Sequence, residues 1–320
     1  MAGEDCGNLS CPFVKYTLTR NPLVSIVVPT FNGSKYLRNS IESILAQDYP
    51  HIELLVFDDG SCDDTQQILE QYGKEFFWES HENIGQSATL NKGWRQASGE
   101  ILSYLSVDDV LISSAVGQAV NALQKHPDAI VVYGDYDLID ESGRPFRRIL
   151  APDFDYRRLI AEFDVQPGPG AFFRREVFDL TGGWNQHLKQ TPDFDFWLKA
   201  GLLGNFYHVS ETWAQFRVHS GSQTYTEASP EKADEYIIAI ENFYAQIKLP
   251  TEIRALRKRA LAMAHTVSAR AHIRSGRFSD AINHLRHAYF IDKHILLRTR
   301  AWKMILSGIR YRIDKLRKSR

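Results

Sequence analysis

The first half of the chain alternates between short apolar runs and longer segments with apolar residues at helical spacing. Strands are predicted at 24–28, 52–57, 76–78, 101–105 and 129–133. Helices are predicted between them, at 35–47, 65–72, 87–97 and 113–125. This alternation predicts an α/β fold with a mostly parallel sheet and helices on both faces.

The pattern changes towards the C-terminus. The stretch Gln166-Pro-Gly-Pro-Gly170 predicts a loop, because neither helices nor strands tolerate this composition. From about residue 230 onward the pattern is continuously helical. We therefore expect an N-terminal extension over 1–22, an α/β domain over 23–228 and a helical region over 229–320.

Composition places the chain among ordinary soluble proteins, with 43% hydrophobic and 24% charged residues. No window approaches the roughly 18 apolar residues that a membrane span needs, and the N-terminus lacks the pattern of a signal peptide. The three cysteines, Cys6, Cys11 and Cys62, are few, and no second Cys/His pair completes a zinc site. A reduced, cytoplasmic protein is expected.

Charge is distributed unevenly along the chain. Residues 251–320 contain 18 Lys/Arg and 4 Asp/Glu, whereas the whole chain has a net charge of -1. In the tail over 295–320, one helical face carries Trp302, Ile305, Leu306, Ile309, Ile313 and Leu316. This pattern predicts either a helix lying on an anionic membrane or one packed on the acidic body of the same chain.

A shorter pattern precedes this tail. Gly276 to Ala281, followed by Ala288, resembles the second half of a tetratricopeptide unit. One such unit does not bury its own apolar face. Docking of this hairpin on the α/β domain is the alternative interpretation.

Pairs of acids follow two of the predicted strands. Asp58-Asp59 comes directly after 52–57, and Asp108-Asp109 follows 101–105 at a short distance. Ligands of parallel sheets bind at the carboxyl ends of the strands, so these acids predict a binding crevice. Adjacent carboxylates suit Mg²⁺ or Mn²⁺. Each pair also has a structural interpretation, as an Asx turn or as the N-cap of the next helix.

Two further polar groups lie later in the chain. Asp193 and Asp195 precede Phe196-Trp197-Leu198, where acids in the first turn of a helix interact favourably with its dipole. A general base is the functional interpretation. His219 lies between residues typical of a loop. It is interpreted either as a hydrogen-bonded group or as a ligand.

Taken together, these segments resemble family 2 glycosyltransferases of the GT-A fold. The resemblance begins with SIVVPTFNGSKYLRNSIESILAQDYPHIELLVFDDGSCDDT and continues with ENIGQSATLNKGWRQASGEILSYLSVDDV. GAFFRREVFDLTGGWN, TPDFDFWLK and FRVHSGSQT follow in the expected order. The similarity covers roughly residues 24–225.

This resemblance implies a nucleotide-sugar pocket. Pro29, Thr30 and Asn32 would line it at the end of the first strand. Asp59, with Asp58 behind it, would hold the base, most often uracil. Asn91 would frame the same pocket.

The resemblance also implies the reacting groups. Asp108 and Asp109 fall at the family's Asp-X-Asp motif, where Asp108 would also contact the donor and both would hold Mn²⁺ or Mg²⁺. His219 would reach the metal or the diphosphate, and Asp193 would deprotonate the acceptor hydroxyl. Two residues depart from the family pattern. Ser106 stands where many members have the first Asp of the metal motif, and Pro192 stands where many have a Glu before the base.

The implied reaction is transfer of a sugar, with inversion, from a nucleotide-diphosphate donor to a hydroxyl of a polysaccharide or glycolipid. A UDP-sugar is the expected donor. The protein is expected at the inner face of a membrane, and no nucleic-acid partner is expected. The alternatives are a nucleotide-sugar-binding module that has lost catalysis and a nucleotidyltransferase. The loop PTFNGSKY, with one glycine, favours the glycosyltransferase over the second alternative.

Overall fold

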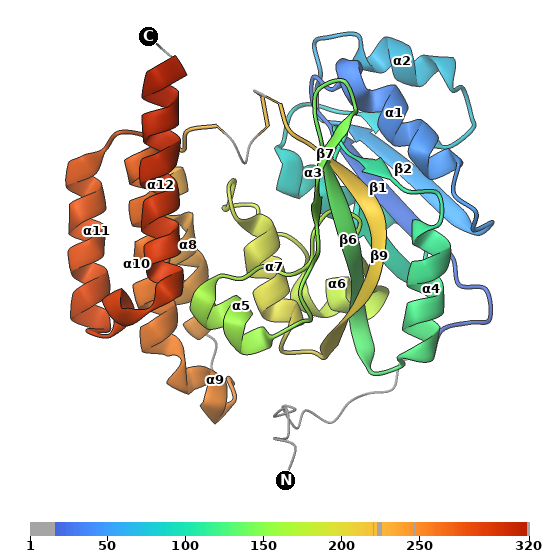
Figure 1. Ribbon diagram of the computed structural model, residues 1–320. Helices are drawn as coiled ribbons and strands as arrows, with labels where there is room; N and C mark the ends of the chain where they lie inside the picture. The colour runs from blue at the N-terminus through green and yellow to red at the C-terminus, as the bar shows by residue number, and fades with distance from the viewer. Residues whose placement is uncertain (1–16, 220, 223–225, 246–247, 319–320) are drawn as a thin grey trace.

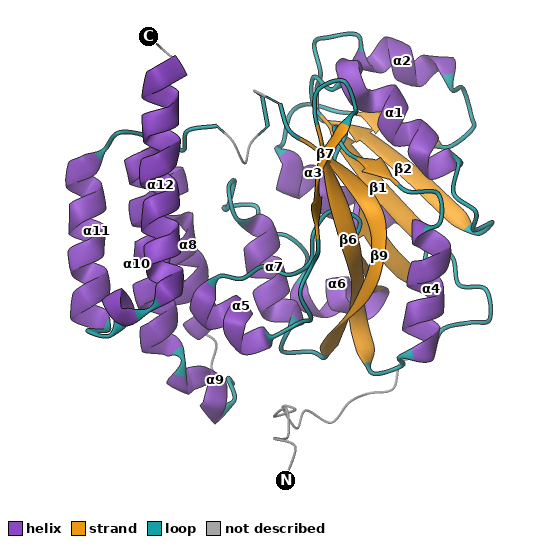
Figure 2. Cartoon of the chain, viewed as in Figure 1, coloured by secondary structure: helices purple, strands orange, loops and turns teal. Residues whose placement is uncertain are grey.

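The computed structural model describes residues 17–219, 221–222, 226–245 and 248–318. A curled sheet has helices on both faces, and a group of C-terminal helices lies beside it (Figures 1 and 2). The predicted α/β fold with a mostly parallel sheet is confirmed. Cys6 and Cys11 lie outside the described residues, and Cys62 is an exposed thiol.

One sheet contains all the described strands, in the order β3-β2-β1-β4-β8-β6-β9-β5, with β7 paired to β6. Its strands are β1 (Val24–Thr30), β2 (Ile52–Asp58), β3 (Phe77–Ser80), β4 (Ile101–Tyr104), β5 (Val110–Leu111), β6 (Ala129–Ile139), β7 (Pro145–Ile149), β8 (Phe172–Arg174) and β9 (Asn205–Arg217). The pairs among β3, β2, β1 and β4 are parallel, as is β6 with β9. Strands β5, β7 and β8 are antiparallel to their neighbours.

The helices fall into two groups. Around the sheet lie α1 (Ser34–Leu45), α2 (Thr65–Gln71), α3 (Gln86–Gln96), α4 (Ala115–Lys125), α5 (Tyr156–Glu162), α6 (Arg175–Thr181) and α7 (Pro192–Ala200). The C-terminal group is α8 (Pro230–Tyr244), α9 (Thr251–Ala255), α10 (Arg257–Arg274), α11 (Phe278–Ile291), a 3-10 turn (Ile295–Leu297) and α12 (Thr299–Lys318). Among the described residues, none of these helices is both long and apolar enough to cross a membrane.

Strand β1 shows how the sequence pattern builds the two layers. Every residue of β1 is buried, as expected for a strand covered on both faces. Val24, Ile26 and Val28 face the core that includes α1 and α4, whereas Val27 faces the core that includes α3 and α7. The period of two along a strand therefore divides one apolar run between two cores.

The predicted first strand ended before Pro29, but β1 continues to Thr30. Strand β4 pairs with β1 only as far as Val27, so beyond that residue only β2 lies beside it. A proline lacks the N–H that a second neighbour would require, and at this position no such neighbour exists. The extension carries Thr30 to the rim of the sheet, beside Asp58.

The C-terminal helices share a core with the sheet. One apolar cluster extends from Val27 and Trp94 through Phe194 of α7 to Phe243 of α8 and Met263 of α10. The predicted boundary at residue 228 lies just before α8 begins at Pro230. That the two parts are separate domains stays a prediction.

Helix α12 packs on α10 through small and apolar residues. Ala301 and Gly308 are buried, and Ile305 is 6% exposed, whereas the other five residues of the predicted apolar face are exposed. A β-carbon at Gly308 would lie 3.1 Å from the carbonyl oxygen of Arg270, which explains why the two helices approach so closely. The residues left exposed form one stripe: Trp302, Leu306, Ile309, Ile313 and Leu316.

Basic residues of α12 also contact the body of the chain. Arg312 and Lys315 pair with Glu227 at 3.2 and 2.7 Å, and Arg300 pairs with Asp164 at 3.1 Å. Helix α12 therefore has features of both interpretations, the helix packed on the acidic body and the helix lying on a membrane. Ion pairs join it to acidic residues of the same chain, and an apolar stripe remains exposed.

Candidate active site

The acids after β2 have different environments. Asp58 is fully buried, and its carboxylate accepts hydrogen bonds from the Ser61 N–H and the Ser80 hydroxyl, at 3.1 and 2.8 Å. Asp59 accepts the N–H groups of Ile84 and Gly85, at 2.7 and 3.0 Å. Asp59 also lines a cavity, so its remaining lone pairs face a space that a ligand can enter.

This cavity, which we call the donor cavity, has a volume of about 900 Å³. Pro29, Thr30, Asp59 and Asp108 are among the residues that line it. The hydroxyl of Thr30 is buried and makes no hydrogen bond among the described residues. An orphaned buried hydroxyl is costly, so a ligand that reached it would gain a favourable partner.

Two predicted nucleotide-binding residues do not line the cavities described here. The Asn32 amide oxygen accepts the Cys62 N–H at 2.9 Å and so joins the loops after β1 and β2. The Asn91 amide bonds both the N–H and the carbonyl of Trp184, at 2.8 and 2.7 Å. In this structure their side chains hold loops in place around the cleft.

The second acid pair follows β4. Asp109 is 4% exposed, and it accepts the Arg217 N–H at 3.0 Å. Burial raises the pKa of Asp109 well above its usual value, and the neighbouring Asp108 adds to the rise. Asp108 lines the donor cavity, and its carboxylate lies 2.9 Å from His219 Nε2.

These residues fit a divalent cation in part. The Asp108 carboxylate is 27% exposed and supplies the oxygen ligands that Mn²⁺ and Mg²⁺ prefer. The Gly221 N–H donates to His219 Nδ1 at 3.2 Å, so in this structure Nε2 carries the ring proton and donates to Asp108. His219 would have to exchange that proton to become a ligand.

Asp193 lies in the first turn of α7 and lines a second cavity of about 240 Å³, which we call the acceptor cavity. Asp109 and Tyr104 line the same space. Burial raises the pKa of Asp193, although the Phe194 N–H opposes the rise. Asp195 points elsewhere, because its carboxylate is 1% exposed and pairs with Lys199 at 2.6 Å.

The two cavities adjoin each other, and together we call them the cleft. Four residues line both of them: Gln86, Ser106, Asp108 and Lys189. Asp59 lies at one end of this cleft and Asp193 at the other, with Asp108 between them. Groups that are far apart in the sequence thus surround a single space large enough for a drug-sized ligand and a second reactant.

One residue of this site was missed by the sequence analysis. The buried carboxylate of Glu235, on α8, accepts the N–H groups of Lys189, Gln190 and Thr191. These three residues lead directly into α7, so Glu235 fixes the segment that presents Asp193. The signal was a glutamate on the apolar stripe of α8, one turn before Ala239 and two before Phe243.

The residue before it, Asp234, belongs to a second polar cluster. Asp234 Oδ1 lies 3.4 Å from His272 Nε2 and 3.2 Å from His284 Nε2, a spacing that would suit a metal. The Arg277 Nε–H, however, donates to His272 Nδ1 at 2.8 Å. Nε2 of His272 therefore carries the proton and donates to Asp234, so the cluster is a hydrogen-bond network joining α8, α10 and α11.

Comparisons with known proteins agree with this fold and site. The family model described as Glycosyl transferase family 2 matches residues 25–181. The chain is 33% identical over 216 residues to an uncharacterized glycosyltransferase of Rickettsia typhi, covering 65% of this chain and 68% of that protein. It is 27% identical over 230 residues to the chondroitin synthase of Escherichia coli, covering 71% of this chain and 33% of that protein.

Two solved structures show the same fold at low sequence identity. TarS 1-349 of S. aureus in complex with UDP-GlcNAc has a TM-score of 0.68 at 19% identity, covering 93% of this chain and 92% of that one. The mannosyltransferase PcManGT from Pyrobaculum calidifontis, in complex with GDP-Man and Mn²⁺, has a TM-score of 0.60 at 18% identity, covering 96% and 90%.

The raised pKa of Asp193 has a consequence for stability. The folded protein binds this proton more tightly than the unfolded chain, whose carboxyl has a pKa near 3.8. Ionised Asp193 therefore destabilises the fold increasingly as the pH rises above 3.8. Asp193→Asn should melt at a higher temperature than the wild type at pH 8, and the difference should shrink as the pH falls towards 3.8.

The measurement is a series of melting curves across this pH range. The matched control is Asp179→Asn, an exposed acid on α6, which should show no comparable pH-dependent gain. A variant Asp193→Asn that is no more stable than the wild type at pH 8 would contradict the assigned direction.

Proposed function

The chain belongs to glycosyl transferase family 2, and we propose that it transfers a sugar, with inversion, from a nucleoside diphosphate donor to an acceptor hydroxyl. A UDP-sugar is the proposed donor, and a hydroxyl of a surface polysaccharide or glycolipid is the proposed acceptor. The observation that carries the proposal is the pair of adjoining cavities, in which Asp59 lines the first, Asp193 lines the second and Asp108 lines both.

The donor cavity is suited to the nucleotide. An ionised carboxylate at Asp59 would accept the imide N–H of uracil, because its oxygens have lone pairs beyond those used by Ile84 and Gly85. The hydroxyl of Thr30 offers a hydrogen bond to the same ligand. The diphosphate would then extend along the cavity towards Asp108.

A divalent cation held by Asp108, with His219 after its proton shift, would offset the charge that develops on the leaving diphosphate. The chain's own residues position the remaining reactants. Arg217 holds the acid pair in place, because its backbone N–H donates to Asp109 and its Nε donates to the carbonyl of Asp108, at 3.0 and 2.9 Å.

Asp193 is the proposed general base. The acceptor hydroxyl is a weak nucleophile, and a positioned carboxylate that removes its proton raises the rate typically by about 10²- to 10⁴-fold. Burial makes Asp193 a stronger base than an exposed aspartate, since it favours the protonated form. Glu235 holds the residues before α7 and so fixes the position of this carboxylate in the cleft.

One alternative is supported by a specific observation. Ser106 lies where many family members have the first acid of the metal motif, and its hydroxyl is 3.4 Å from Asp108 Oδ1. A module that binds the nucleotide sugar without transferring it would share this feature. Hydrolysis of a nucleotide sugar by the purified protein would exclude that alternative.

The main test uses Asp193→Asn. A panel of nucleotide sugars with Mn²⁺, screened by thermal shift, identifies the donor, and nucleotide release with glycan acceptors measures turnover. Turnover should fall by about 10²- to 10⁴-fold, because the base is lost. The thermal shift caused by the donor should persist, since the donor cavity is unchanged. Asp179→Asn is the matched control, and full turnover by Asp193→Asn would refute the assignment.

The cation site has a separate test in Asp108→Ala. This variant should bind the donor more weakly and respond less to added Mn²⁺, because it lacks the carboxylate that faces the cavity. Titration of the donor with and without Mn²⁺ gives both quantities. Equal enhancement by Mn²⁺ in the variant and the wild type would place the cation elsewhere. Asp137→Ala, a change outside both cavities, serves as the control.

We further propose that α12 holds the protein on the inner face of an anionic membrane. The exposed stripe of α12 includes Leu306 and Ile313, which are 57% and 44% exposed, and exposed cations such as Lys303 and Arg310 flank it. This arrangement is typical of helices that lie in the lipid headgroup region. Ion pairs with anionic lipids would add to the apolar contribution.

Liposome co-sedimentation tests this assignment. The wild type should sediment with vesicles that contain phosphatidylglycerol more than with vesicles of phosphatidylcholine alone, because the cations attract anionic headgroups. Replacing Leu306, Ile309 and Ile313 by glutamate should abolish sedimentation. A triple glutamate variant at the exposed uncharged positions Thr251, Ala255 and Asn283, which changes the charge by the same amount, should retain it. Equal sedimentation of the wild type and the α12 variant would end the membrane proposal.

A further inference from the structure

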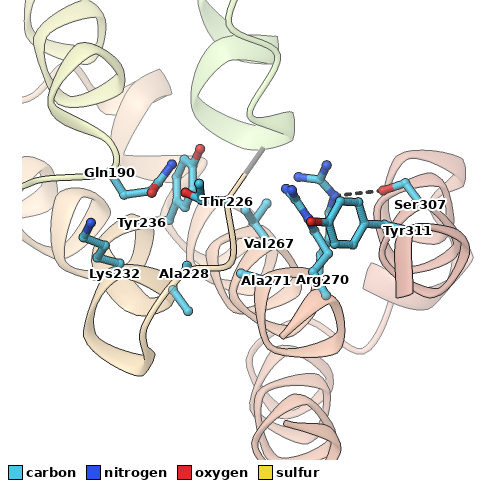
Figure 3. A pocket seen from close by; sticks show the side chains of 12 residues that line it. Gln190, Thr226, Ala228, Lys232, Tyr236, Val267, Arg270, Ala271, Ser307 and Tyr311 are labelled. Carbon is cyan, nitrogen blue, oxygen red and sulfur yellow. Dashed lines mark hydrogen bonds between the residues drawn. The ribbon is translucent and has the colours of Figure 1, made fainter. Parts of the chain in front are cut away.

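A third cavity lies between α8, α10 and α12, next to the cleft (Figure 3). Its volume is about 330 Å³. In Figure 3, Gln190, Lys232 and Tyr236 line one side, and Arg270, Ser307 and Tyr311 line the other. The segment before α7, through Gln190, and the C-terminal helices thus enclose this space together.

The cavity is cationic. Lys232, Arg270 and Arg274 line it, and no carboxylate does so among the described residues. The hydrogen bond described for Arg270 joins its Nε to the neutral hydroxyl of Ser307 at 2.8 Å (Figure 3). No ion pair of Arg270 or Lys232 with an acid occurs in the described part of the chain. A charge in such a place is costly unless a counter-ion is present.

The environment of Arg270 shows this cost. Burial lowers the pKa of Arg270, and the neighbouring Arg274 lowers it further. Arg274 in turn lies over the ring of Tyr311, with its guanidinium carbon 4.2 Å from the ring centroid. Arg270 and Arg274 are one turn apart on α10, so they lie on the same face of the helix, and both line this cavity. Two guanidinium groups held side by side form a site for an anion with several oxygens.

The cavity adjoins the reacting groups of the cleft. Gln190 lines both this cavity and the acceptor cavity, which contains Asp193. Tyr236 of α8 lines this cavity but not the acceptor cavity. Arg270, Ser307 and Tyr311 line neither the acceptor cavity nor the donor cavity, whereas Thr226 and Lys232 also line the donor cavity. The arginines therefore lie beyond the cleft, in a cavity that adjoins it through Gln190, Thr226 and Lys232.

We propose that this cationic cavity binds an anionic group, a phosphate or a carboxylate, that the acceptor glycan carries near its reacting hydroxyl. This inference rests on the proposed transfer reaction. The anionic group would bind Arg270 and Arg274, and a hydroxyl on the adjoining residue would reach Asp193 past Gln190. The acceptor class is thus an acidic glycan, such as one with phosphodiester links or uronic acids.

The first experiment needs no turnover and uses inorganic phosphate as the probe. Melting curves are recorded in EDTA, with phosphate or chloride at equal ionic strength. Phosphate should raise the melting temperature of the wild type, and Arg270→Gln should weaken the apparent phosphate affinity by about 10- to 100-fold. Arg270→Lys should restore part of it. Arg257→Gln, an exposed cation on the same helix, is the matched control and should behave as the wild type.

Two outcomes of this experiment would overturn the proposal. One is the absence of any phosphate effect on the wild type. The other is an undiminished effect in Arg270→Gln, which would place the phosphate elsewhere in the cleft. If Arg270→Gln does not fold, Arg274→Gln replaces it, because Arg274 lines the same cavity and neither cavity of the cleft.

The second experiment separates donor from acceptor. Arg270→Gln should leave the thermal shift by the nucleotide sugar unchanged and should raise KM for acidic acceptor glycans by about 10- to 100-fold, with little change for neutral glycans of equal length. Loss of the donor shift would assign the cavity to the donor's diphosphate and overturn the proposal. If no nucleotide sugar binds even the wild type, the proposed function fails, while the phosphate experiment still decides whether the cavity binds anions.

Discussion

A carboxylate in a protein interior must find hydrogen-bond donors or remain next to water, and this constraint determines how the cleft is built. Asp58 is fully buried and is satisfied by the loop after β2 and by Ser80. Glu235 is satisfied by three successive backbone N–H groups. Four other acids line the cavities of the cleft, where water or a ligand can reach them: Asp59, Asp108, Asp109 and Asp193.

The same constraint joins the two parts of the chain. Glu235 on α8 holds the segment before α7, and its neighbour Asp234 bonds the histidines of α10 and α11. One dipeptide of α8 therefore contacts both the cleft and the helical hairpin. The shared apolar core adds to this connection, since Phe194 of α7 and Phe243 of α8 belong to one cluster. The C-terminal helices form a wall of the site as well as a support for it.

Local patterns in the sequence were enough for much of the α/β half. Periodicity located β1 to β4 and α1 to α4 within a few residues, because each element carries its own apolar spacing. The acids at strand ends were found because parallel strands place them at one edge. Strand β9 was missed, since its pairing with β6 depends on residues some 75 positions apart rather than on a local signal.

Side-chain partners were less accessible to sequence reasoning than the elements themselves. Asn91 was expected to frame a pocket. Its amide instead forms hydrogen bonds with the backbone of Trp184, a partner that only the three-dimensional fold brings next to it. Ile305 was placed on the same apolar face as Trp302, but Ile305 is buried against α10 and α11, whereas Trp302 is exposed. The cationic cavity arises from three helices, and no single segment of the sequence encodes it.

The contact between α12 and α10 at Gly308 determines how far apart the walls of that cavity lie. With no side chain at 308, the backbones approach until the glycine nearly touches the carbonyl of Arg270, and Tyr311 follows one turn later. A bulkier residue there would act as a wedge, pushing Tyr311 away from the arginine beneath it. Gly308, the smallest residue of α12, therefore determines the width of the cationic cavity, whose lining includes large arginine and tyrosine side chains.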